Sequence, residues 1–285
     1  MNTEPMSLGK VKRLIDLAVR RAGWTFGIVL LASMAEDSLP AAAPAGDEKG
    51  AFARADERRW REIFLDPGTG RWSDQWFLDG EIGTVSNGPM GMTLAAGPEA
   101  KNDAHHVVLW TKDSFKGDVK IEFDYTRLDH AGEYVNILYI QATGSGTGRF
   151  VSDIAAWRDL RRVPAMRTYF DHMHTYHLSY ATFPDAEQSR AYLRGRRYLP
   201  EQAGLKGTGL QPDYFPVGLF GTGVRHQITV IKQDRALFVR VVNAEQTYYC
   251  HLVNAGLPII TEGRIGLRHM FTRSARYANF RVSVP

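Results

Sequence analysis

Short runs of β-branched and aromatic residues follow one another between residues 91 and 284, separated by Gly, Pro, Asn and Asp. Such runs predict strands, and the residues between them predict tight reversals of the chain. Many strands at even spacing, with few helices, favour an all-β sandwich or jelly roll. We expect strands at 91–96, 104–111, 117–127, 133–142, 174–183, 225–232, 235–242, 246–252, 263–270 and 276–284.

The segments between these strands predict less regular structure. Gln233-Asp234 separates two strand patterns directly and predicts a tight hairpin. Residues 153–170 are expected to form a short helix or a long loop over one face of the sandwich. Residues 184–224 are rich in proline and predict extended loop structure, and long loops in a compact domain often carry function.

The amino-terminal residues differ from the rest of the chain. Basic residues precede an apolar run over 22–34, and small residues follow over 39–46, which is the order of a secretory signal. The apolar run is shorter than the roughly 20 residues of a membrane span. We therefore expect residues 1–45 to be a signal peptide and linker of a periplasmic or secreted protein, with a cytosolic extension as the alternative. We expect 46–63 to be a solvated connector and 64–285 to be the β-sandwich domain.

Charge and cysteine content limit the partners. The chain has 35 Lys and Arg against 31 Asp and Glu, a net charge of only +4. A nucleic-acid-binding protein would show a denser basic stripe, so we expect no nucleic-acid partner. With Cys250 as its single cysteine, the chain forms no internal disulfide and no cysteine-based zinc site, and we expect a buried thiol.

Three histidines, His172, His174 and His177, lie within six residues of one another, at the start of the strand predicted over 174–183 and just before it. Imidazole is the side chain best suited to moving protons near neutral pH, and tyrosines surround the cluster. Alternation along a strand places His174 with Tyr176 and Tyr180 on one face and His177 on the other. His172-x-His174 also has the spacing of two metal ligands, but nothing marks a third ligand. We expect no cofactor, with a divalent metal as the alternative.

Two other strands present polar and aromatic side chains on one face. His106 shares a face with Trp110, and Arg264 shares one with Arg268. A concave sheet lined by Trp, Tyr, His and Arg suits a sugar, because aromatic rings cover its apolar faces and Arg binds acidic substituents. Glu122-x-Asp124 places two carboxylates on one strand face. Such a pair suits glycoside hydrolysis, although an ordinary half-exposed strand has the same pattern.

Several strings of the chain resemble the YesU-like proteins, a family catalogued as a domain of unknown function. These strings are Gly91–Leu94, His105–Trp110, Phe115–Asp118, Ile137–Gly144, His172–Tyr180, Arg196–Tyr198 and Gly263–Met270. The resemblance covers roughly residues 64–284. It implies a concanavalin-A-like β-sandwich with a concave groove and long loops, and a link to polysaccharide utilisation, including pectin breakdown.

Together these features predict a carbohydrate-active enzyme that cleaves an acidic, uronate-containing polysaccharide by β-elimination. In this hypothesis arginine neutralises the uronate carboxylate, histidine removes the C5 proton and tyrosine protonates the leaving oxygen. The predicted catalytic residues are His106, His174, His177, Tyr180 and Arg268. The predicted substrate-binding residues are Trp110, Asn136, Tyr139, Gln141, Arg197, Arg264 and His269. Hydrolysis by Glu122 and Asp124 is one alternative, and a non-catalytic carbohydrate-binding protein is another.

Overall fold

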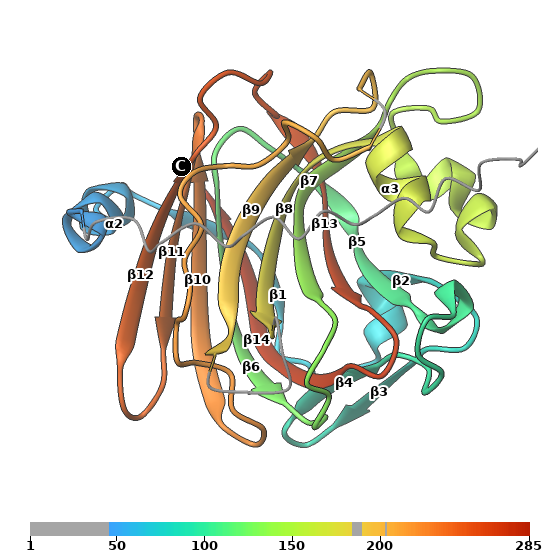
Figure 1. The fold of residues 1–285 in the computed structure, drawn as a ribbon, viewed down its shortest axis with the longest axis horizontal. Coiled ribbons are helices and arrows are strands. Elements are labelled where there is room, and N and C mark those ends of the chain that lie inside the picture. Colours follow the sequence, from blue (N-terminus) through green and yellow to red (C-terminus); the bar gives the residue numbers. More distant parts are fainter. Residues whose placement is uncertain (1–45, 184–189, 203) are drawn as a thin grey trace, which may run out of the picture. The chain divides into compact units, whose positions relative to one another are not determined.

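Two antiparallel sheets stack face to face in the computed structural model, which describes residues 46–183, 190–202 and 204–285 (Figure 1). In spatial order the eight-stranded sheet contains β12 (Thr247–Val253), β11 (Ala236–Val242), β10 (Arg225–Gln233), β6 (Val119–Arg127), β14 (Ser274–Val284), β4 (Gly91–Ala95) and β3 (Thr84–Gly88). Its remaining strand, β1 (Arg61–Asp66), pairs with β14. The predicted all-β sandwich is confirmed.

The six-stranded sheet contains, in spatial order, β2 (Trp76–Asp79), β5 (Val107–Lys116), β13 (Glu262–His269), β7 (Asn136–Gly144), β8 (Met173–Thr182) and β9 (Tyr192–Tyr198). Each strand expected from the sequence is present, within a few residues of its predicted ends. The sequence prediction missed four further strands, namely β1, β2, β3 and β9.

Strand β9 lies in a segment that we expected to be loop. Its sequence contains a glycine and three arginines, and none of its residues is β-branched, so its own strand tendency is weak. Pairing with β8 and close packing produce the strand instead. A Cβ on Gly195 would lie 2.9 Å from the Leu210 side chain, so a larger residue here would force Leu210 to shift.

The predicted hairpin joins β10 to β11, but its turn is Asp234-Arg235, one residue later than expected, because Gln233 still belongs to β10. Gln233 pairs with Ala236, and Asp234 takes a positive φ of 48° between them. A two-residue turn with positive φ matches the twist of the paired strands, and Asp accepts this conformation more readily than most residues.

The main hydrophobic core lies between the sheets and draws on the inward-facing positions of both. Cys250 belongs to this core and is fully buried, as expected, and burial raises the pKa of its thiol well above the ordinary value. The thiol therefore stays protonated and acts as a small apolar group.

A second core covers the outer face of the six-stranded sheet. The short helices η3 (Ile154–Arg161) and α3 (Met166–His172) lie across this face and bury it (Figure 1). Ile154, Trp157 and Tyr169 from this layer pack against Trp110 and Tyr139 from the sheet. The prediction of a short helix over one face is confirmed, and its consequence is that this face is closed.

Helix α2 (Glu48–Asp56) packs on the outer face of the eight-stranded sheet, at the end formed by β10, β11 and β12. The Asp47 side chain caps it by accepting a hydrogen bond from the Gly50 amide at 3.0 Å. Phe52 and Ala55 are buried against Ile231. The expected solvated connector is therefore a packed helix, because one side of it carries apolar residues that the sheet covers.

The predicted signal peptide and linker, residues 1–45, lie outside the described residues. Among the described residues, no helix has the length and apolar character needed to cross a membrane. The remaining short helical turns are η1 (Trp72–Asp74) and η2 (Asp103–His105).

Candidate functional site

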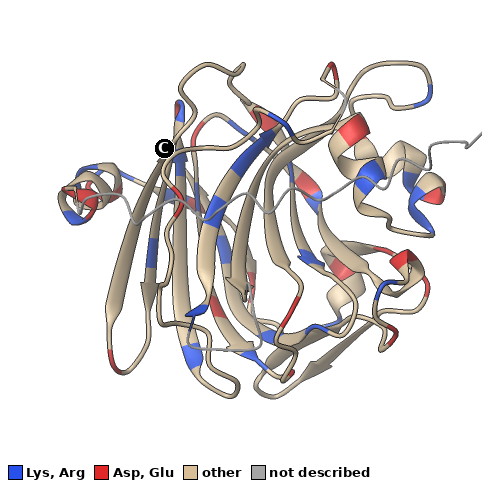
Figure 2. Ribbon diagram, in the orientation of Figure 1, with Lys and Arg blue, Asp and Glu red and all other residues tan. Residues whose placement is uncertain are grey.

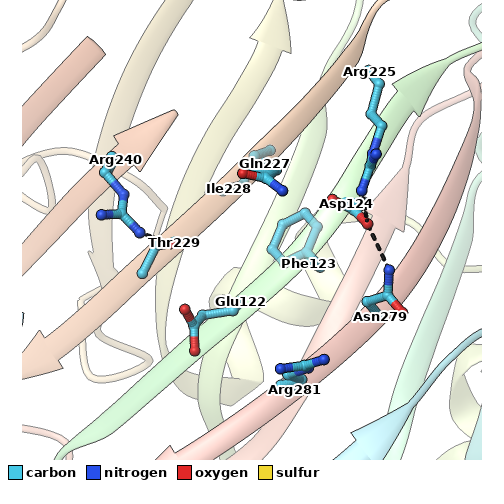
Figure 3. A pocket seen from close by; sticks show the side chains of 10 residues that line it. All are labelled: Glu122, Phe123, Asp124, Arg225, Gln227, Ile228, Thr229, Arg240, Asn279 and Arg281. Atoms are coloured by element: carbon cyan, nitrogen blue, oxygen red, sulfur yellow. Dashed lines mark hydrogen bonds and ion pairs between the residues drawn. The ribbon is translucent and has the colours of Figure 1, made fainter. Parts of the chain in front are cut away.

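The outer face of the eight-stranded sheet carries a polar groove, which we call the open-face groove. Strand alternation turns Glu122 and Asp124 of β6 outward, while Phe123 between them joins the core. The groove has a cavity volume of about 280 Å³ and lies over β6, β10, β11 and β14 (Figure 3). Its lining residues are Glu122, Phe123, Asp124, Arg225, Gln227, Ile228, Thr229, Arg240, Asn279 and Arg281.

Asp124 is the most constrained polar residue of the groove. Its carboxylate accepts a 2.8 Å hydrogen bond from Arg225 Nη2 and a 2.7 Å hydrogen bond from Asn279 Nδ2 (Figure 3). The Asp124 side chain is 11% exposed, whereas that of Arg225 is 63% exposed. Asp124 is thus held at the base of the groove, while the arginine above it meets solvent.

A β-bulge in β14 explains how Asn279 reaches Asp124. The pairing of β14 with β6 shifts between Ala278 and Arg281, and Asn279 has a φ of +52°. The extra residue lets Asn279 face the groove while Phe280, the next residue, still fills the core. Asn tolerates this left-handed conformation better than most side chains do.

The other charged groups of the groove are compensated by neighbours. Arg240 lies 3.9 Å from Asp56 of α2, and Arg281 lies 3.7 Å from Glu62. The Glu122 carboxylate lies 3.4 Å from the Lys120 ammonium. Donors and acceptors are therefore interleaved along the groove, and no large field of a single sign develops.

A second cavity, the rim pocket, has a volume of about 580 Å³ and brings together His174 and Arg197 of the predicted set. It is lined by Thr143, Ser152, His174, Arg197, Leu199, Glu201 and 258–262. Arg197 Nη1 donates to His174 Nδ1 at 3.3 Å, and His174 Nε2 lies 3.2 Å from the Glu201 carboxylate. Burial, and then the Arg197 charge, lower the pKa of His174, against the opposing effect of Glu201. The imidazole is therefore neutral at pH 7.

His106, Trp110, Tyr139, His177 and Arg268 lie together, but under the η3–α3 layer rather than in an open groove. Trp110 stacks on Tyr139 at 5.3 Å between ring centroids, and Arg268 Nη2 contacts His106 Nδ1 at 2.7 Å. None of these five residues is more than 4% exposed, and none lines either cavity, whereas Arg197, although only 3% exposed, lines the rim pocket. The prediction that these residues contact substrate directly is wrong, because the second hydrophobic core covers this face of the sheet.

Burial also fixes the charge of the two histidines in this covered group. It lowers the pKa of His106 to about 3, with Arg268 adding to the effect, and lowers the pKa of His177 well below its ordinary value. The His177 ring bonds to Tyr198 and Ser179, each at 2.5 Å. Both imidazoles are neutral and support packing.

Tyr180, Asn136 and His269 face the space between the sheets. The Tyr180 hydroxyl bonds to the Tyr277 hydroxyl at 2.6 Å, and His269 Nε2 bonds to the same Tyr277 oxygen at 2.7 Å. Asn136 donates to the Tyr125 hydroxyl at 2.8 Å. We expected Tyr180 to face a substrate groove together with His174 and Tyr176. This expectation is wrong, because Tyr176 and Tyr180 pack in the main core.

The two remaining predicted residues hold loops and strands in place. Gln141 has a positive φ of 56° at a bulge, and its buried amide donates to the Phe115 and Gly117 carbonyl oxygens at 3.0 and 2.9 Å. Arg264 pairs with Asp153 at 2.9 Å and so attaches the start of η3 to β13. Gln141 therefore does not reach a ligand, and Arg264 is already paired.

The metal alternative depends on His172 and His174 sharing a strand face. His172 instead ends α3, where its ring stacks on Phe150 at 3.6 Å between centroids, and only His174 lies in β8. Within the described ranges, no group of three His, Cys, Asp or Glu side chains is arranged to hold a metal ion.

Sequence reasoning recognised the outward carboxylate pair Glu122 and Asp124 but missed the residues around it. Arg225, Gln227 and Thr229 alternate with the buried residues His226, Ile228 and Val230 in β10, which is a detectable signal of an outward polar face. That signal does not separate a binding surface from any solvent-facing strand. The contribution of Asn279 depends on a bulge that no local pattern marks.

Of three similar solved structures, the one with a TM-score above 0.5 supports the fold. A protein of unknown function with a galectin-like fold from Bacillus subtilis is 18% identical, covers 79% of this chain and 99% of its own, and gives a TM-score of 0.55. The carbohydrate-binding module CBM66 from Bacillus subtilis is 13% identical over 74% of this chain and 96% of its own, with a TM-score of 0.43. The VIP36 exoplasmic/lumenal domain, bound to Ca²⁺ and Man3GlcNAc, is 10% identical over 79% of this chain and 90% of its own, with a TM-score of 0.48.

No protein of curated function matches the sequence. A family model described as a domain of unknown function, DUF1961, matches residues 72–282. This range covers most of both sheets, and the match agrees with the resemblance to the YesU-like proteins. The chain therefore belongs to the DUF1961 family.

Proposed function

We propose that this protein binds an acidic, uronate-containing saccharide in the open-face groove. The observation that carries this proposal is the Asp124 carboxylate, held by Arg225 and Asn279 at the base of an accessible cavity. A fixed carboxylate accepts hydrogen bonds from sugar hydroxyls, and the neighbouring amide and guanidinium groups donate to them. Sugars need such paired donors and acceptors in one place.

The distribution of charge favours a saccharide over a nucleic acid. Basic and acidic positions are interspersed over the strands (Figure 2). In the groove itself, Arg225 pairs with Asp124, and Arg281 lies near Glu62. A phosphate backbone would need several uncompensated cations in a row. Export to the periplasm or the cell exterior is part of the same proposal and rests on the sequence of residues 1–45.

Calorimetric titration with uronate oligosaccharides tests this proposal. Asp124→Asn removes the charge but keeps the size of the side chain, and we expect it to weaken binding about tenfold or more, the usual effect of losing a charge-assisted hydrogen bond. Asp113→Asn makes the same change at an exposed aspartate that lines neither the open-face groove nor the rim pocket, so it is the matched control and should bind as the wild type does. Wild-type protein that binds no member of an oligogalacturonate, oligoglucuronate and oligomannuronate panel would refute the proposal.

A second candidate function is β-elimination in the rim pocket, favoured by the contact between His174 and Arg197. When a uronate carboxylate accepts the Arg197 donor, His174 Nδ1 is released with a free lone pair. His174 then takes the C5 proton, the C4–C5 double bond forms and the C4–O bond breaks. The leaving oxygen accepts the same proton back from His174, so the reaction needs no other reactant.

Absorbance at 235 nm separates this reaction from binding alone. New unsaturated ends indicate elimination, whereas new reducing ends without absorbance indicate hydrolysis, for which Glu122 and Asp124 are the available carboxylates. We expect His174→Ala to abolish elimination and Asp124→Asn to spare the chemical step. Elimination that continues at the wild-type rate in His174→Ala would rule out this assignment.

A further inference from the structure

Arg276 lies at one end of the open-face groove, in β14. Its neighbours Ala275 and Tyr277 are buried in the main core, so Arg276 faces outward. It pairs with Thr126 of β6 on one side and with Thr93 of β4 on the other. Arg276 is half-buried at this position.

A further cavity of about 250 Å³, separate from the rim pocket, extends the groove to Arg276. The two cavities share Asp124, Arg225 and Asn279, so they form one continuous depression. The residues added at this end are Met90, Thr126, Arg276 and Ala278. A ligand that contacts Asp124 can therefore extend over Arg276 along the same face of the sheet.

Arg276 differs from the other arginines of the groove in its partners. Arg225 is paired with Asp124, Arg240 lies near Asp56, and Arg281 lies near Glu62. Within the described ranges, no hydrogen bond, ion pair or aromatic ring engages the Arg276 guanidinium. The depression therefore has one uncompensated positive charge, located at this end.

We infer that Arg276 binds the carboxylate of one sugar unit, while Asp124 and Asn279 bind hydroxyl groups of the neighbouring unit. This inference rests on the proposed saccharide binding and specifies its ligand. A guanidinium matches a carboxylate through two parallel N–H···O bonds. A single unpaired arginine selects one carboxylate, which favours a uronate chain over a densely sulfated one.

The charge-neutral substitution Arg276→Gln tests this inference. The probes are oligogalacturonate, oligoglucuronate and oligomannuronate, each as the free acid and as the carboxyl methyl ester, which keeps the hydroxyl groups and removes the charge. We expect Arg276→Gln to weaken binding of the preferred free acid about tenfold, the loss of one charge-assisted contact, and to leave ester binding unchanged. The wild type should prefer the acid by a similar factor.

Arg61→Gln is the matched control. Arg61 is exposed, lines neither cavity of the depression and carries the same charge, so its loss reports the effect of net charge alone. Equal binding of acid and ester by the wild type, or equal loss of both in Arg276→Gln, would overturn the carboxylate assignment while saccharide binding stands. Wild-type protein that binds neither form of any probe would overturn the proposed function, and the assignment with it.

Discussion

The Asn279 amide donates a 2.7 Å hydrogen bond to the Asp124 carboxylate, from the bulge of β14 to the outward face of β6. This contact joins two strands whose bonded residues lie 155 positions apart in the sequence. It makes the bulge part of the groove, because the same extra residue that interrupts the pairing supplies the amide. Bulges near functional sites often redirect a side chain in this way.

Substitutions at Asn279 should separate its amide from its backbone conformation. Asn279→Gly keeps the positive φ of 52° but removes the amide, so we expect near wild-type stability and weakened saccharide binding. Asn279→Val adds backbone strain of about 1–3 kcal/mol and should lower stability as well. Urea unfolding and calorimetric titration measure the two effects. Equal stability of the Gly and Val variants would contradict the role of the bulge.

The hydroxyl of Tyr277 should matter more for stability than the hydroxyl of Tyr180. Tyr277 bonds to both Tyr180 and His269, at 2.6 and 2.7 Å, so Tyr277→Phe leaves two buried partners without a bond. We expect it to cost about 2–3 kcal/mol, and Tyr180→Phe about 1 kcal/mol. Chemical denaturation of both variants and of the double variant measures the order.

The same variants test the position of Tyr180. Burial raises the pKa of Tyr180 well above its ordinary value, so its hydroxyl stays protonated between the sheets. We therefore expect Tyr180→Phe to keep saccharide binding, and any eliminase activity, at the wild-type level per folded molecule. A loss of activity in a stably folded Tyr180→Phe protein would show that this residue reaches substrate.

The local sequence pattern was enough to predict most strands and which of their residues share a face, but not which face of each strand is open to solvent. Strand β8 shows why. His177 and Ser179 on one side are as buried as Tyr176 and Tyr180 on the other. A strand that is covered on both faces gives no inside-to-outside contrast in its sequence. The covering layer η3–α3 comes from a separate segment, and its docking depends on tertiary contacts.

The groove was harder to predict for a related reason. Glu122-x-Asp124 indicates an outward strand face, but a carboxylate pair becomes a candidate site only when Arg225 and Asn279 lie beside it. Those neighbours come from β10 and β14, which reach β6 through long-range pairing. Residue chemistry instead drew attention to histidine and tyrosine, most of which the structure uses for packing.

The buried pair of Asp79 and Arg161 should control the stability of the η3–α3 layer. Both side chains are fully buried, with Arg161 Nε 2.5 Å from Asp79 Oδ2, and Trp110 and Tyr169 donate to the same oxygen. Arg161→Met leaves a buried carboxylate without its counter-charge, and we expect a loss of about 3–5 kcal/mol. Hydrogen exchange should accelerate first in η3.

A double variant provides the control for this pair. Asp79→Leu combined with Arg161→Met removes both charges, so it should recover part of the stability that Arg161→Met loses. Additive losses in the double variant, measured by urea unfolding, would show that the two side chains contribute independently and that the ion pair does not hold the layer.

Buried histidines should make the protein less stable in mild acid. Burial lowers the pKa of His106 and His269 to about 3 and the pKa of His226 to about 4, with neighbouring arginines adding to the effect for the first two. The unfolded chain has the ordinary value near 6.5, so it binds protons first as the pH falls. The stability that comes from keeping these histidines neutral is complete above pH 6.5. It is lost progressively as the pH falls towards 4 for His226 and towards 3 for His106 and His269.

Each such histidine should contribute about 1.4 kcal/mol of destabilisation per pH unit within this window. Urea unfolding at pH 7.5, 6.0 and 5.0 measures the slope before carboxylates titrate. His226 Nε2 accepts a 3.0 Å hydrogen bond from the Phe220 amide, and His226→Gln keeps a polar group at this position that does not titrate. This variant should be less stable at pH 7.5 but have a shallower slope. An unchanged slope would show that His226 does not contribute to acid sensitivity.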